Sequence, residues 1–258
     1  MMKRSLYIAL AVLILGLPGL TIFSACSAPR PEPGPKAAII DQLGTLLPNQ
    51  AFIEQATREL EEYGFKVDVY PGDAVTVDLY RELPAYGYKL ILFRVHSGLL
   101  GVDPKVTNRT WLYTNEPYSK TSHLVEQFDD QVTYARTNDD APWCFAVSAK
   151  FIDKSAEGQF DDTAIIMLGC DALHFEDVAQ AFIQRGASTY VAWDASVMLD
   201  YVDDATLFLV EKLCSDELTV KEAVAQTMVE KGPDSIYGSV LKYYPGQSAL
   251  KTLSQLID

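Results

Sequence analysis

The chain has 258 residues and a formal net charge of −14. That negative charge argues against a nucleic-acid partner and against electrostatic binding to anionic lipid. The four cysteines include no CxxC pair, so we expect no structural zinc site. We also expect no other metal and no cofactor.

Residues 1–25 are predicted to be a signal peptide of the lipoprotein type. Two basic residues precede an apolar run at residues 6–17, which has the length of a signal peptide and is short for a transmembrane helix. The sequence FSAC at residues 23–26 then resembles a bacterial lipobox, whose cysteine is lipidated and becomes the new N-terminus. Phe23 replaces the usual aliphatic residue, and an uncleaved membrane anchor is the alternative. We expect an extracytoplasmic protein attached to the cell membrane by lipid on Cys26.

A proline-rich tether is predicted at residues 26–36, followed by one α/β domain at residues 37–258. From residue 37 to residue 95, short apolar runs alternate with amphipathic segments. The pattern predicts strands at 37–43, 65–70 and 89–95, and helices at 50–63 and 75–86. This alternation is typical of a parallel sheet with crossover helices.

The middle of the chain, residues 98–162, is polar, and we expect irregular structure there with a hairpin or two. Its strand-like segments are TWLYT at 110–114 and WCFAVSAKFI at 143–152. Regular alternation then returns, with strands predicted at 164–168 and 188–193 and helices at 175–185, 199–214 and 219–232. Thr219 and Glu222 match a capping box, and Asp203–Asp204 is interpreted as a charge pair near a helix start. The predicted fold class is three-layer α/β/α with a mostly parallel central sheet.

Two predicted strands lead directly to reactive side chains. LILFRVHSG at 90–98 contains His96, and AIIMLGCDA at 164–172 contains Cys170. A cysteine nucleophile needs a base or a cation nearby, because the thiolate is the reactive form. Reactive groups collect where parallel strands end, so we expect these two strands to be adjacent. His96 and Cys170 are therefore the candidate catalytic residues.

Glycines accompany both candidate residues. Gly98 and Gly169 are expected to provide the backbone freedom that tight turns and oxyanion-binding amides require. Of the cysteines other than Cys26, three remain, so at least one thiol lacks an intramolecular partner.

The order of the two residues distinguishes enzyme classes. A cysteine enzyme of the α/β-hydrolase type places its histidine after the nucleophile and has glycines where this chain has Leu168 and Ala172. The order histidine then cysteine, and the segment LGCDALHFEDVAQAFIQRGASTYVAW, resemble the caspase–gingipain–legumain superfamily of cysteine peptidases, in particular its CHAT-type members. The resemblance covers roughly residues 37–232, with the middle segment unmatched.

This resemblance implies a caspase-like fold and an endopeptidase that cleaves peptide or protein substrates. Cys170 would be the nucleophile and His96 the general base or ion-pair partner. The amides of Cys170, Ser97 and Gly98 would supply the oxyanion hole. Two residues depart from the family pattern: Ser97 replaces the glycine after the histidine, and Asp171 replaces a small residue after the cysteine.

The resemblance also suggests a pocket for the residue before the cut, near Trp193 and Asp194. We expect that residue to be basic, received by Asp194 or, as second choice, by Asp171. Two other functions remain open. Ser97 and Asp171 favour a catalytically inactive caspase-like domain that serves as a binding or sensing module. A solute-binding lipoprotein would fit the tether but requires two lobes.

Overall fold

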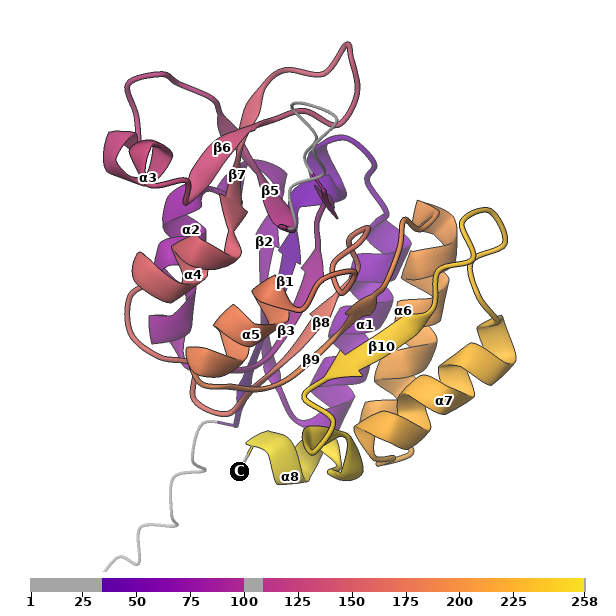
Figure 1. Ribbon diagram of the computed structural model, residues 1–258. Helices are drawn as coiled ribbons and strands as arrows, with labels where there is room; N and C mark the ends of the chain where they lie inside the picture. The colour runs from indigo at the N-terminus through magenta and orange to yellow at the C-terminus, as the bar shows by residue number, and fades with distance from the viewer. Residues whose placement is uncertain (1–33, 100–108, 258) are drawn as a thin grey trace, which may run out of the picture. The chain divides into compact units, whose positions relative to one another are not determined.

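The computed structural model describes residues 34–99 and 109–257 (Figure 1). The predicted signal peptide, Cys26 and most of the predicted tether lie outside these ranges. Within the described ranges, no helix has the length and apolar character needed to cross a membrane.

The centre of the molecule is a six-stranded sheet in the order β10-β9-β8-β3-β1-β2. Five strands are parallel, and β10 runs antiparallel to β9 at one edge. The predicted parallel sheet is confirmed, including the adjacency of the strands that precede His96 and Cys170. The strands are β1 (Lys36–Asp41), β2 (Lys66–Pro71), β3 (Tyr88–Arg94), β8 (Thr163–Met167), β9 (Ala187–Trp193) and β10 (Leu241–Tyr244).

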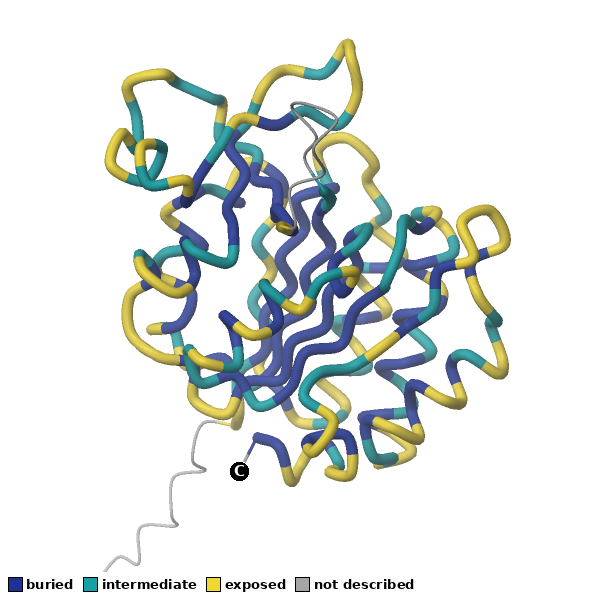
Figure 2. The backbone as a smooth tube through the Cα atoms, in the orientation of Figure 1, coloured by how far each residue is buried: buried dark blue, intermediate teal, exposed yellow. Residues whose placement is uncertain are grey.

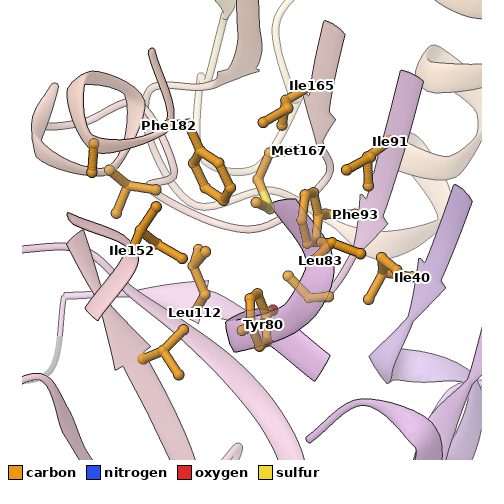
Figure 3. Close-up of a cluster of buried hydrophobic side chains, with 14 of the residues drawn as sticks. Ile40, Tyr80, Leu83, Ile91, Phe93, Leu112, Ile152, Ile165, Met167 and Phe182 are labelled. Carbon is orange, nitrogen blue, oxygen red and sulfur yellow. The ribbon is translucent and has the colours of Figure 1, made fainter. Parts of the chain in front are cut away.

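Helices cover both faces of this sheet, which makes three layers. One face packs against α2 (Val77–Glu82), α4 (Ala149–Lys154) and α5 (Asp177–Gln184). Figure 3 shows part of this core, where Phe93 and Met167 of the sheet meet Tyr80 of α2 and Phe182 of α5. The other face packs against α1 (Gln50–Tyr63), α6 (Leu199–Cys214), α7 (Val220–Lys231) and α8 (Leu253–Ile257).

Alternation along the strands explains the two cores. Ile39 and Leu92 point to the α1 and α6 side, whereas Ile40 and Phe93 point to the α2 and α5 side. The inner strands are therefore apolar at almost every position, as expected for a sheet covered on both faces. Figure 2 shows these strands buried, with the exposed residues on the outer sides of the helices and on the loops.

The middle of the chain forms a second, antiparallel sheet in the order β4-β5-β7-β6. Its strands are β4 (Ser97–Gly98), β5 (Trp111–Pro117), β6 (Val132–Ala135) and β7 (Cys144–Ser148), and helix α3 (Leu124–Phe128) lies between β5 and β6. The predicted strand at 143–152 is wrong beyond Ser148, where α4 begins. Phe151 and Ile152 fit a helix because they both face the core beside α5.

Several predicted helix boundaries agree with the structure. Asn49 caps α1, and Gly64 ends it in a left-handed conformation with φ 112°. Thr219 and Glu222 form both hydrogen bonds of the predicted capping box. The predicted helix at 75–86 is shorter, because Pro84 lies in a 3-10 turn that follows α2. Strand β10 lies after residue 232, where no strand was predicted.

Candidate active site

The candidate histidine and cysteine leave the central sheet side by side. β3 and β8 are hydrogen-bonded neighbours with Phe93 opposite Met167, and His96 and Cys170 lie equally far beyond that pair. Both residues line one small pocket at the carboxyl ends of the two strands. The structure therefore brings together the two residues that the sequence identified.

Ser97 holds the two strand ends against each other. Its hydroxyl donates a hydrogen bond of 2.6 Å to the Cys170 carbonyl. A Cβ added at Gly169 would lie 2.0 Å from the Ser97 hydroxyl oxygen and 2.8 Å from the Val95 carbonyl oxygen. Gly169 is therefore needed because no side chain fits between the two turns.

Gly98 and Gly169 were expected to provide unusual backbone conformations, but the residue that adopts one is Asp171. Neither glycine has a positive φ, whereas Asp171 adopts a left-handed conformation with φ 55°. Aspartate tolerates this region better than most residues. The expected role of the two glycines is thus corrected: Gly169 permits close approach, and the unusual backbone lies at the residue after Cys170.

His96 is held through its backbone by two neighbours. Its amide donates to the Gln42 side-chain oxygen at 2.8 Å, and its carbonyl accepts from the Tyr113 amide at 2.9 Å. Gln42 is 1 % exposed, and its own amide group donates to Asn115 at 2.7 Å. Gln42 was not predicted as a site residue, because it belonged to the predicted strand at 37–43 and no local pattern indicates a contact with His96.

The His96 ring is held in its neutral form. Burial, together with the positive charge of Arg94, lowers the pKa of His96 to about 4. The ring therefore carries no charge near neutral pH and has a free lone pair that can accept a proton. The ion-pair alternative, which requires an imidazolium at His96, is not supported by this arrangement.

Cys170 lies beside the start of α6. Its Sγ accepts a hydrogen bond from the Val197 amide at 3.4 Å, and its thiol donates to the Val197 carbonyl at 3.7 Å. Burial raises the pKa of Cys170, and the negative charge of Asp171 adds to that effect. Among the described residues, no hydrogen bond joins the His96 ring to this sulfur, so the resting pair is a neutral thiol beside a neutral imidazole.

The other two described cysteines are also free thiols. Burial raises the pKa of Cys144 to about 11 and that of Cys214 to about 12. Neither lines the pocket that contains Cys170.

The two amides predicted next to His96 for the oxyanion hole point in different directions. Ser97 is paired with Leu112 and Gly98 with Trp111 in the β4–β5 ladder. In that register the Gly98 amide faces the Trp111 carbonyl, whereas the Ser97 amide points away from β5. The Ser97 amide is the better of the two candidates.

A buried arginine that was not singled out from the sequence supports this edge of the sheet. Arg94 has no exposed surface and ends β3, two residues before His96. Its guanidinium binds Asp203 of α6 through two hydrogen bonds of 2.9 Å, Asp41 at 2.8 Å and the Leu47 carbonyl at 3.0 Å. Asp203 is thus a buried partner of Arg94, which corrects its interpretation as part of a charge pair at a helix start.

The acidic residues predicted to receive the substrate have other partners. Asp194 forms an ion pair of 2.8 Å with Lys242 and accepts the Val240 amide at 2.9 Å. Burial alone would raise the pKa of Asp194, but hydrogen bonds from Lys242 and Val240 outweigh it and lower the pKa. Asp171 accepts the Ser196 hydroxyl at 3.2 Å, and burial raises its pKa.

Trp193 is a core residue of β9. Its side chain is 1 % exposed and packs edge-on against Tyr201, with ring centroids 5.3 Å apart. Neither Trp193 nor the two aspartates Asp171 and Asp194 lines the pocket shared by His96 and Cys170. The pocket therefore gives no support to the substrate contacts predicted for all three.

Within residues 34–99 and 109–257, no group of three or more His, Cys, Asp or Glu side chains could hold a metal ion. No protein-family model matches this chain, and no curated protein matches it.

Proposed function

We propose that this protein is a cysteine endopeptidase with a caspase-like fold, held outside the cytoplasm by lipid on Cys26. The observation that carries the proposal is the position of His96 and Cys170. They follow adjacent parallel strands, in the chain order of the caspase superfamily, and line the same pocket. The Ser97 contact to the Cys170 carbonyl supports it further, because it holds the two turns in fixed register.

In the proposed reaction, Cys170 Sγ attacks the carbonyl carbon of the scissile peptide bond while its proton passes to the neutral His96 ring. The Ser97 and Cys170 amides would stabilise the negative charge on the carbonyl oxygen. His96 then gives the proton to the leaving amine as the C–N bond breaks, which leaves an acyl thioester on Cys170. A water molecule, losing a proton to His96, hydrolyses the thioester and restores the thiol.

The neutral resting pair has a consequence for pH dependence. His96 must be unprotonated to act as the base, and its pKa is about 4 rather than 6.5. We therefore expect the acid limb of kcat/KM to lie near pH 4, measured with a cleaved fluorogenic peptide. An acid limb near 6.5 would contradict the neutral pair.

The second candidate is a catalytically inactive caspase-like domain that binds or senses a partner. The raised pKa of Cys170 and the carboxylate of Asp171 next to it favour this alternative, because both oppose formation of the thiolate. The two candidate functions differ in one testable property: in a peptidase, His96 increases the reactivity of the Cys170 thiol, and in an inactive domain it does not.

Peptide-library digestion by the full chain tests the proposal. Cys170→Ala and His96→Ala should each lower kcat/KM by at least about 1,000-fold while the circular dichroism spectrum stays unchanged. Cys144→Ala is the matched control, because this cysteine is also half-buried and free, and it should retain activity. If no peptide is cleaved and iodoacetamide labels Cys170 equally fast in the wild type and in His96→Ala, the inactive-domain alternative is correct.

A further inference from the structure

Among the residues that the structure describes, the pocket shared by His96 and Cys170 is otherwise lined only by apolar residues and a glycine. Four segments converge on it: the turn after β1, the residues after β3, the residues after β8 and the start of α6. Their side chains give it an aliphatic wall formed by Leu43, Leu47, Leu168, Val197, Leu199 and Val202.

The pocket is small. Its cavity volume is about 40 Å³. Ligand-binding pockets of proteins begin at roughly 300 Å³, so this one can admit at most one short side chain and not a long or aromatic one.

Charged groups lie nearby but do not reach the pocket. Arg94 precedes the lining residue Val95, and Asp203 follows the lining residue Val202. Arg94 has no exposed surface, and all three of its guanidinium nitrogens are bonded to Asp41, Asp203 or the Leu47 carbonyl. The arginine therefore cannot receive an acidic substrate, and the two aspartates cannot receive a basic one.

We infer that this pocket receives the side chain before the scissile bond and selects a short aliphatic residue, with valine or alanine preferred to lysine, arginine, aspartate or glutamate. A charged side chain would lose its water in an aliphatic pocket that offers no opposite charge. The inference rests on the proposed peptidase function and replaces the basic specificity expected from Asp194.

Peptidyl chloromethyl ketones that differ only in the last residue test this directly. Probes ending in valine, lysine and aspartate are incubated with the full chain, and the rate of Cys170 alkylation is measured by mass spectrometry. The valine probe should label Cys170 at least about 100-fold faster than either charged probe. His96→Ala should slow labelling by all three probes, because the group that accepts the thiol proton is lost.

Two neighbouring leucines provide a matched pair of variants. Leu47 lines the pocket and Leu46 does not, although they are 47 % and 45 % exposed. Leu47→Glu should slow labelling by the valine probe and accelerate labelling by the lysine probe, because it adds a carboxylate at the pocket. Leu46→Glu should leave the order of the probes unchanged.

The outcomes separate the inference from the proposed function. If the lysine or aspartate probe labels Cys170 fastest, and His96→Ala slows that labelling, the aliphatic pocket is wrong and the peptidase proposal survives. The same holds if both glutamate variants behave alike. If no probe labels Cys170 faster in the wild type than in His96→Ala, the peptidase proposal fails, and the inference fails with it.

Discussion

At the scale of single residues, the geometry of the site depends on a close approach between two turns. Ser97 and Asp171 depart from the pattern of the family that the sequence resembles, yet each has a defined place. The Ser97 hydroxyl bonds to the Cys170 carbonyl, and Asp171 takes the left-handed backbone position after the cysteine. A glycine at position 97 could not make the first of these contacts.

Gly169 should therefore be hard to replace. Gly169→Ala places a methyl group 2.0 Å from the Ser97 hydroxyl oxygen, so we expect the free energy of unfolding to fall by about 1–3 kcal/mol in urea titrations. Gly98→Ala is the control, because its added Cβ meets nothing within 4 Å, and it should cost less than about 1 kcal/mol. Equal losses for the two variants would show that the contact with Ser97 is unimportant.

At the scale of secondary-structure elements, one buried guanidinium connects three of them. Arg94 at the end of β3 binds Asp41 at the end of β1 and Asp203 in the second turn of α6. Burial is the larger cause of the lowered pKa of His96, and the positive charge of Arg94 adds to it. A charge placed in the core to hold the sheet and helix together thus also helps to keep the proposed base neutral.

Adjacent aspartates of α6 allow this connection to be tested. Asp203→Asn should lower the free energy of unfolding by about 3 kcal/mol, because it leaves the buried Arg94 with one carboxylate instead of two. Asp204→Asn removes the ion pair between Asp204 and Lys231, in which the Asp204 carboxylate is exposed. It should lower the free energy of unfolding by no more than about 1 kcal/mol. Chemical denaturation measures the free energy of unfolding of both variants. A smaller loss for Asp203→Asn than for Asp204→Asn would contradict the role given to Asp203.

At the scale of the whole molecule, the described residues form the α/β domain, and the predicted anchor lies outside them. The anchor remains a prediction from the lipobox-like sequence before Cys26. With a net charge of −14, attachment to an anionic membrane would have to come from acyl chains and not from charge.

Replacing Cys26, the predicted site of lipidation, tests the predicted anchor. Cys26→Ser should abolish incorporation of labelled palmitate and either release the protein from membranes or leave the signal peptide uncleaved. Cys144→Ser, which changes a cysteine within the domain, should not alter labelling or fractionation. A Cys26→Ser protein that is cleaved at the same bond and still sediments with membranes would favour an ordinary anchor.

The sequence by itself determined the features that depend on local pattern. The alternation of apolar runs and helices predicted the parallel sheet, and Gly64 and the Thr219–Glu222 capping box predicted helix boundaries. His96 and Cys170 each follow an apolar strand in the sequence. They were therefore predicted to be neighbours, because the carboxyl ends of parallel strands lie at the same edge of a sheet.

Only the tertiary structure decided what surrounds those two residues. The consecutive strands β6 and β7 form a hairpin of the kind expected in this region, but the pairing of β5 with β7 and of β10 with β9 joins distant segments, and no local pattern specifies such pairing. The burial of Arg94, the partners of Asp194 and the aliphatic pocket also bring together side chains from separate elements. Charge state and specificity follow from burial and from neighbouring charges, and both of these are properties of the packed molecule.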